Sequence, residues 1–175
     1  HTPMTIERTQ LVPEHVNGLI VTYTFYLPER ASGGKSHTIC TEFTARTNLR
    51  PDWLAEEIGV FDGEYDEAQY VEEEHAFAVK DSAHPWHAMI GCSEAPEKQE
   101  TSVDLCGSEV VLGNGTGVRM SHQFVLQPGE KKQISFYVAA SLKSETECAD
   151  VYHALTGGTD FEQEKAEKYE KLLAQ

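Results

Sequence analysis

Residues 117–126 (GVRMSHQFVL), 127–130 (QPGE) and 131–141 (KKQISFYVAAS) form the stretch of sequence that decides the fold. Apolar and polar side chains alternate on both sides of the turn, which is the period-2 pattern of strands with one buried face. In the turn, Pro128 fixes its own φ and Gly129 is free to adopt a positive φ. The stretch therefore predicts two strands joined as a hairpin. The residues predicted to point inward are Val118, Met120, Phe124 and Leu126 on the first strand and Ile134, Phe136, Val138 and Ala140 on the second.

Two earlier segments repeat this alternation. Residues 19–27 (LIVTYTFYL) alternate strongly and end at Pro28, and residues 37–46 (HTICTEFTAR) alternate after the loop 30–35 (RASGGK). We expect these two strands to pair as a long antiparallel hairpin. Shorter strands are predicted over residues 4–10, 68–73, 75–81, 86–92 and part of 101–112.

The fold class that follows is mainly β: a two-sheet antiparallel β-sandwich with at least eight strands. A short helix is predicted near 51–58 (PDWLAEEI), because Pro51 suits a first helical turn and acidic residues lie near its N-terminus. A chain of 175 residues has room for one core. We therefore expect a sandwich domain over 1–142 and a helical linker over 143–175, leading toward a downstream domain.

Two helices are predicted in that linker. Ser144 and Glu147 have the spacing of a capping box, and Gly157 and Gly158 end the first helix. The first helix has a full apolar stripe, formed by Cys148, Val151, Tyr152 and Leu155. The second helix has a narrow stripe, formed by Phe161, Tyr169, Leu172 and Leu173. We expect Phe161 and Tyr169 to dock on the sandwich and the two leucines to stay exposed as a contact surface.

The charge of the chain restricts its partners. There are 29 acidic and 14 basic side chains, and the net charge is −15. This balance argues against nucleic acid and against anionic membrane surfaces, since both require basic residues. No apolar run approaches the length of a membrane span, and the first residues lack the pattern of a secretory leader. We expect a soluble chain whose ligand is a neutral molecule such as a sugar, a cation or a basic partner.

The four cysteines are Cys40, Cys92, Cys106 and Cys148. None forms a C-x-x-C pair, so neither a zinc ribbon nor a thioredoxin-like motif is present. Cys40 and Cys148 lie in segments with apolar patterning, and we expect both to be buried thiols.

An acidic segment extends from residue 56 to residue 74, with nine carboxylates and no Lys or Arg. Asp62, Glu64, Asp66 and Glu73 occupy positions 1, 3, 5 and 12 of a calcium-loop spacing. However, Glu67 stands where such a loop requires glycine, and residues 68–73 have a strand pattern. The segment is therefore either a calcium site or a solvated acidic face used for interaction.

Asp81, His84 and His87 form a D-x-x-H-x-x-H pattern. Carboxylate and imidazole groups are ligands for zinc. Pro85 breaks helical spacing, so the two histidines need not converge, and loop histidines at the rim of the sandwich are the alternative.

Four aromatic residues are candidates for sugar contacts, because aromatic faces pack against the apolar faces of sugar rings. Trp86 directly precedes an apolar strand and Trp53 lies in the predicted short helix, so core packing is the alternative for both. No G-x-S-x-G motif and no recognisable Cys/His pair is present, so we expect no catalytic residue in this chain. The candidates for carbohydrate contact are Trp53, Tyr65, Tyr70 and Trp86.

The order of segments in the second half of the chain resembles a known domain. The matching segments are Leu126–Glu130 (LQPGE), Phe136–Ser141 (FYVAAS), Asp81–Ser93 and the helix over Asp160–Leu173. This arrangement is similar to the N-terminal β-sandwich ("supersandwich") domain of glycoside hydrolases with an (α/α)6-barrel catalytic domain, as in glucoamylase-like, glucodextranase-like and glycogen-debranching enzymes. The resemblance covers roughly residues 70–175. It implies that the catalytic carboxylates lie in a barrel outside this chain.

Three functional hypotheses follow. The first is a non-catalytic β-sandwich domain that supports the catalytic barrel of a glycoside hydrolase. The second is a self-standing module that binds oligo- or polysaccharide, which requires an exposed aromatic platform. The third is a metal-binding or interaction domain that uses the acidic segment 56–74, with calcium as the one cofactor considered.

Overall fold

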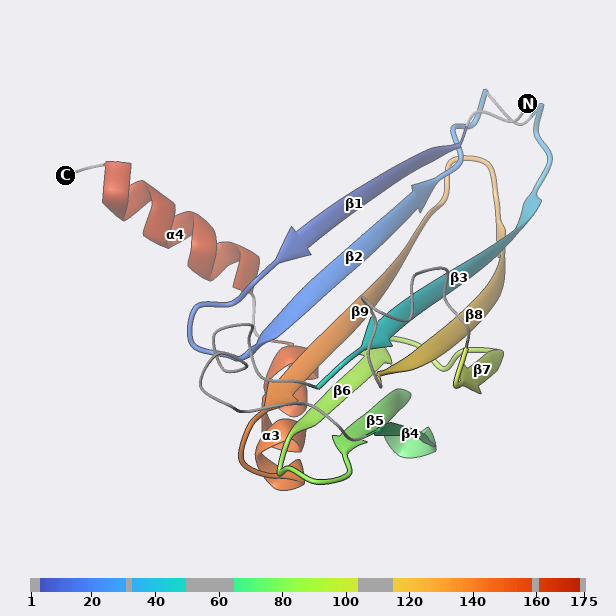
Figure 1. Cartoon of the computed structure of the whole chain (residues 1–175). Coiled ribbons are helices and arrows are strands. Elements are labelled where there is room, and N and C mark those ends of the chain that lie inside the picture. The colour runs from blue at the N-terminus through green and yellow to red at the C-terminus, as the bar shows by residue number, and fades with distance from the viewer. Residues whose placement is uncertain (1–3, 31–32, 50–64, 104–114, 159–160, 174–175) are drawn as a thin grey trace.

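The alternating segments assemble into two antiparallel sheets in the computed structural model, which describes residues 4–30, 33–49, 65–103, 115–158 and 161–173. The larger sheet has the order β1-β2-β9-β6-β5-β4, and the smaller sheet has the order β3-β8-β7 (Figure 1). The prediction of a mainly β, two-sheet antiparallel sandwich is confirmed. The strands are β1 (Thr5–Leu11), β2 (Gly18–Tyr26), β3 (His37–Thr47), β4 (Asp66–Val71), β5 (Ala76–Asp81), β6 (His87–Cys92), β7 (Lys98–Thr101), β8 (Thr116–Leu126) and β9 (Lys131–Ser141).

Both predicted hairpins are wrong, because each pair of strands is divided between the two sheets. β2 pairs with β1 and β9, whereas β3 pairs with β8. The turn before β9 forms as predicted: Glu130 N–H donates to Gln127 O at 3.0 Å and Gly129 has a φ of 81°. However, this turn carries the chain from one sheet to the other. Alternation determines which face of a strand is buried, but it does not determine the neighbouring strand.

Helix α3 (Glu145–Thr156) covers the outer face of the larger sheet. Ser144 caps it, since its side chain accepts a hydrogen bond from Glu147 N–H at 3.1 Å. The predicted stripe is confirmed, with Cys148, Tyr152 and Leu155 buried. These three side chains pack with Leu11, Ala76, Met89, Ala139 and Phe161 in a second core.

Ala140 was predicted to point inward together with Ile134, Phe136 and Val138. It lies on the same face of β9, opposite Ala88, but it is exposed, whereas Ala139 is fully buried under α3. Both faces of β9 carry apolar side chains because one face meets the smaller sheet and the other meets α3, so period-2 alternation alone could not show which alanine is buried.

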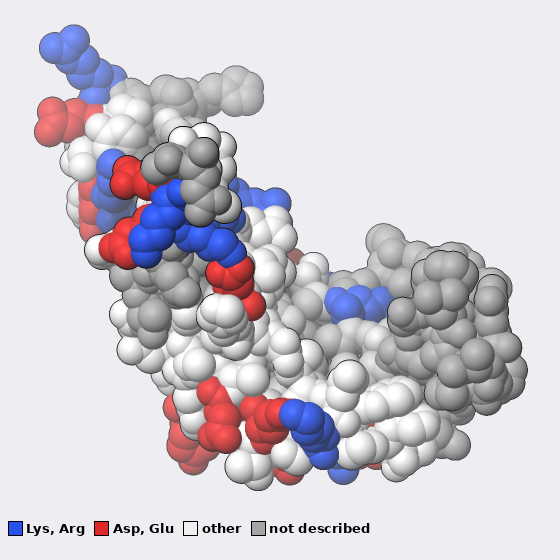
Figure 2. Space-filling view, turned by 90° about the vertical axis from the view of Figure 1, so that its left-hand side faces the viewer, with Lys and Arg blue, Asp and Glu red and all other residues white. Residues whose placement is uncertain are grey.

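Helix α4 (Phe161–Leu173) leaves the body of the sandwich and points away from it (Figure 1). Figure 2 shows the molecule from this side, and basic and acidic side chains lie next to one another there. In the described part of the chain, no helix is both long and apolar enough to cross a membrane.

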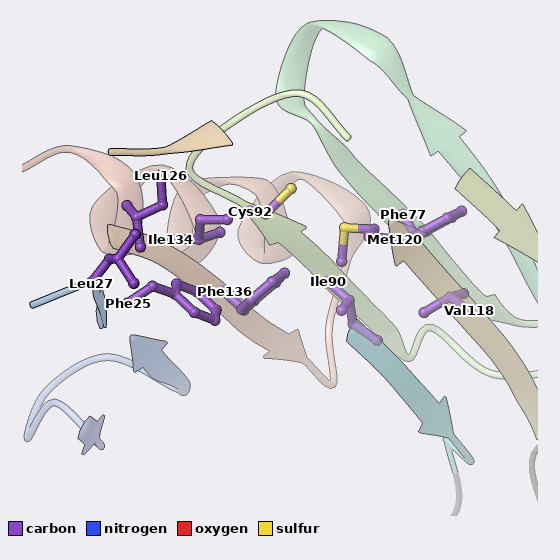
Figure 3. Packing of buried hydrophobic residues seen from close by; sticks show 10 residues of the cluster. All are labelled: Phe25, Leu27, Phe77, Ile90, Cys92, Val118, Met120, Leu126, Ile134 and Phe136. Carbon is purple, nitrogen blue, oxygen red and sulfur yellow. The ribbon is translucent and has the colours of Figure 1, made fainter. Parts of the chain in front are cut away.

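The main core lies between the two sheets (Figure 3). It confirms the predicted inward faces of β8 and most of β9, and β2 contributes Phe25 to it. Phe43 of β3 stacks on Phe136 of β9, with ring centroids 4.1 Å apart, which joins the smaller sheet to the larger one. The core residues shown in Figure 3 are Phe25, Leu27, Phe77, Ile90, Cys92, Val118, Met120, Leu126, Ile134 and Phe136.

The two cysteines that were expected to be buried differ in the structure. Cys148 is buried as expected, but Cys40 is exposed, because it alternates with the inward residues Ile39 and Thr41 on β3. The predicted helix near 51–58 lies outside the described residues.

Candidate functional site

The clearest candidate site is the surface formed by α4. Phe161, at the start of the helix, is only 8% exposed and packs in the second core. Beyond it, Tyr169, Leu172 and Leu173 are 64%, 57% and 73% exposed. The expected docking of Phe161 is confirmed, and so is the exposure of the two leucines. The expected docking of Tyr169 is wrong, because α4 touches the sandwich mainly through its first turn.

A groove of about 680 Å³ lies between α4 and the segment that follows β1. Leu11, Val12 and Pro13 line one side, and Tyr169 and Leu172 of α4 line the other. Val12 is itself 65% exposed, so the groove continues the apolar surface of the helix. Exposed apolar residues that adjoin one another in this way are typical of protein–protein contact sites.

The rim of the groove is charged. Lys165, Lys168 and Lys171 follow one another at intervals of three along α4 and all line the groove. Lys168 forms an ion pair with Glu14 on the opposite rim. The contribution of residues 11–14 could not be predicted from the sequence, because nothing in a short stretch after a strand indicates that a helix 150 residues later will lie beside it. The spacing of the lysines was the available signal.

The turn after β5 contains the Asp81, His84 and His87 pattern. Asp81 Oδ1 accepts hydrogen bonds from the N–H groups of Ala83 and His84, at 2.9 and 2.6 Å, and lies 2.8 Å from His84 Nδ1. Burial alone would raise the pKa of Asp81, but these hydrogen bonds outweigh it and hold the pKa below its ordinary value. His87 lies in β6, opposite Lys80, and does not join the cluster. The arrangement stabilises a turn through an ionised carboxylate.

Trp86 belongs to the same turn. Its ring stacks on His84, with centroids 4.0 Å apart and planes 8° from parallel. Trp86 is half-buried. Because His84 stacks on it, one face of the indole ring is already occupied.

The other aromatic residues that were candidates for sugar contacts each have a different environment. Tyr70 lies edge-on to Phe77 at 5.2 Å and packs against the main core, where burial and the nearby Cys92 and Glu72 raise its pKa to about 12. Tyr65 is 69% exposed at the start of the described segment. Trp53 lies outside the described residues. Among the described aromatics, none forms a flat exposed platform with another.

Two of the four proposed calcium ligands, Asp66 and Glu73, lie within the described residues. Asp66 is buried at the start of β4, and its Oδ2 accepts a hydrogen bond from Leu49 N–H at 2.8 Å. Glu73 is exposed in a 3-10 turn, Glu72–Glu74, beyond the other end of β4. The strand between them spans about 16 Å, at roughly 3.3 Å per residue, so the structure does not bring these two carboxylates together. Asp62 and Glu64 lie outside the described residues. Within the described ranges, no three His, Cys, Asp or Glu side chains are grouped to hold a metal ion.

No family model and no curated protein matches the sequence. Among solved structures, the chain is similar to a protein from the human microbiome described as a kojibiose phosphorylase, with a TM-score of 0.51 and 10% identity. That match covers 88% of this chain and 18% of the phosphorylase chain, so this chain spans less than a fifth of it. A protein from Escherichia coli K12 described as an aldose 1-epimerase matches with a TM-score of 0.47 and 7% identity, over 79% of this chain and 65% of that chain. The likeness to the phosphorylase shows a shared β-sandwich fold.

Proposed function

We propose that this chain is the non-catalytic β-sandwich domain of a carbohydrate-active enzyme, and that it supports a catalytic (α/α)6 barrel in the same polypeptide. The observation that carries the proposal is the surface of α4. A helix of 13 residues that buries one large side chain and exposes Tyr169, Leu172 and Leu173 is marginal alone in water. A partner that covers these three residues would stabilise it.

The buried carboxylates support a structural role. Asp66 and Asp81 lie opposite each other on β4 and β5, where two acids could in principle act as a catalytic pair. Asp66 instead accepts a hydrogen bond from Leu49 N–H and Asp81 accepts from the N–H groups of Ala83 and His84, and the lowered pKa of Asp81 makes it a poor proton donor near neutral pH.

The sandwich likeness supports the rest of the proposal. The matched phosphorylase is much longer than this chain, so a sandwich of this kind occurs there as part of a larger polypeptide. The resemblance described from the sequence implies a barrel after the helical linker, and α4 points outward on that side.

Amide hydrogen exchange tests the proposal. Exchange in residues 169–173 is measured in this chain and in the chain extended by its downstream coding sequence. We expect strong protection to appear only in the extended protein. Leu172→Lys should reduce that protection and the activity of the enzyme on its sugar substrate, while the control Glu170→Lys changes neither. A stop codon after Gln175, or equal exchange in both proteins, would reject the proposal.

A further inference from the structure

A second cavity lies where the two sheets separate, between edge strands β1 and β3. Its volume is about 270 Å³, and its wall includes Ile6 of β1, Tyr23 of β2, Thr41 and Phe43 of β3, and Ile134 and Phe136 of β9. Ile6 is 54% exposed, because the smaller sheet does not cover β1. The cavity is therefore open at the edge of the sandwich and closed by the main core behind.

The apolar wall is held in a fixed arrangement. The rings of Phe43 and Phe136 stack within 10° of parallel, and Tyr23 meets Phe136 edge-on at 6.1 Å. These rings come from three strands in two sheets, so each is held by a different part of the backbone. A pocket of this kind is largely formed before a ligand arrives, and an apolar face is what it best accepts.

Two polar groups lie in or behind this wall without hydrogen-bond partners. Thr41 Oγ1 and His122 Nε2 are both buried and unpaired, and the two residues are direct neighbours across β3 and β8. His122 is only 6% exposed and its ring contacts Phe136 edge-on at 5.8 Å. Buried polar groups in folded proteins usually have a partner. Rotation about χ1 of Thr41 exchanges its hydroxyl and methyl positions, so the hydroxyl can reach a partner inside the cavity.

A cationic side chain lies near the outer edge of the cavity. Arg8 lies over the ring of Tyr23, with Cζ 6.0 Å from the centroid, and donates a hydrogen bond to Gln10 Oε1 at 3.1 Å. Glu42 is part of the lining, but its side chain is 63% exposed and extends toward Arg119, 4.0 Å away. The site thus combines an aromatic interior with one cationic side chain beside its mouth.

We propose that this cavity binds a neutral pyranose sugar, as a free monosaccharide or as the end of a longer chain. The apolar face of the ring would pack on the aromatic wall, one hydroxyl would pair with Thr41, and the outer hydroxyls would stay hydrated at the open mouth, near Arg8. A purely apolar guest would leave Thr41 unpaired, and a charged guest would lose its hydration without a counter-charge in the interior. The proposal is independent of the contact made by α4.

Methyl NMR on the full 175-residue chain tests this site. The chain carries ¹³C-labelled isoleucine methyl groups and is titrated separately with methyl glucopyranosides, galactopyranosides, mannopyranosides and xylopyranosides, and with toluene as an apolar probe. Ile6 and Ile134 report on the cavity, and Ile20, which packs against the second core, is the internal control. We expect saturable shifts at Ile6 and Ile134 but not at Ile20, with a dissociation constant of about 1 mM for at least one pyranoside.

Two variants and a control make the test specific. Thr41→Val removes only the hydroxyl and should weaken binding about tenfold. Ile6→Trp should block the mouth and abolish the shifts at Ile134. Thr44→Val changes an exposed threonine on the opposite face of β3 and should leave binding unchanged. The proposal is overturned if no pyranoside gives saturable shifts, if toluene binds and sugars do not, or if Thr41→Val binds as well as Thr44→Val. None of these results would affect the proposal for α4, which is tested in the extended protein.

Discussion

Helices α3 and α4 have nearly the same length, 12 and 13 residues, but very different surroundings. α3 buries Cys148, Tyr152 and Leu155 against the larger sheet, while Phe161 is the only buried residue among the described side chains of α4. The exposed residues of α4 include several lysines and glutamates, whereas those of α3 are mostly acidic or neutral, with His153 as its one basic residue. The comparison shows that helix propensity does not decide which helix is fixed to the domain; the spacing of apolar residues does.

That spacing is visible in the sequence. Apolar residues in α3 recur at intervals that keep them on one face of the helix. This face packs against apolar residues on the outer side of the larger sheet. In α4, seven residues lie between Phe161 and Tyr169. One anchor therefore holds the first turn, and the rest of the helix extends beyond the sheet.

The largest expected effect comes from comparing the tyrosines of the two helices. Tyr152→Ala removes a ring that is 1% exposed and a hydrogen bond to Glu74 O of 3.1 Å, and should lower the free energy of unfolding by about 3–5 kcal/mol. Tyr169→Ala should change it by less than about 0.5 kcal/mol. Urea unfolding of both variants provides the measurement. Equal losses would mean that α4 is as firmly packed as α3.

The sequence predicted the faces of the strands better than their neighbours. Val118, Met120 and Phe136 point into the main core as predicted. The partners of β3 and β9 were missed, because a proline–glycine turn suits a sheet-to-sheet connection as well as a hairpin. Pairing depends on the whole topology, which the local pattern does not contain.

For the candidate sites, too, the local sequence pattern predicted only the features that do not depend on the topology. The exposed leucines of α4 were predicted, because a narrow stripe leaves few apolar residues to bury. The cavity beside Thr41 was missed, and so was the burial of His122, which interrupts an apolar row and looks like a polar position in the sequence. That the His122 side chain faces the core is known only from the packing of the two sheets.

A smaller effect is expected at the contact between α3 and β6. A Cβ added at Gly91 would lie 2.0 Å from Tyr152 Oη and 2.7 Å from Ala76 Cβ. Gly91→Ala should therefore cost about 1–3 kcal/mol of stability. Tyr152→Phe removes the closest atom, so the double variant should lose clearly less stability than the two single variants together. If the losses are additive, α3 does not press on β6 as the structure describes.

The pH dependence of the core provides a third test of whether α3 and the sandwich are one unit. Burial lowers the pKa of His122 below its ordinary 6.5, with Lys132 also lowering it and Glu94 and Glu97 opposing. The unfolded chain then takes up a proton first, so the contribution to stability is complete above 6.5 and is lost as the pH falls toward the lowered pKa.

The free energy of unfolding, measured at about pH 7.5 and about pH 5, should fall less between these pH values in His122→Phe than in the wild type. The control His15→Gln changes an exposed residue and should behave like the wild type. In hydrogen exchange, α3 and β9 should lose protection together in acid. The residues of α4 beyond Phe161 should be weakly protected at both pH values. An unchanged pH dependence in His122→Phe would show that another group is responsible.

The smallest expected effect concerns the ion pair between Lys168 and Glu14, the one described polar link from the middle of α4 to the sandwich. Both side chains are about half exposed, at 50% and 47%, so water and salt screen their attraction. Lys168→Ala and Glu14→Gln should each lower stability by about 0.2–1 kcal/mol, and the effect should shrink further in high salt. Neither change should alter protection in α3. If either variant costs much more than 1 kcal/mol, α4 is held along its length by its own domain, and the difference between the two helices is smaller than their burial indicates. If the cost is near zero and exchange in residues 165–173 is unchanged, Phe161 alone anchors the helix, and its outer turns are available for the partner that we propose.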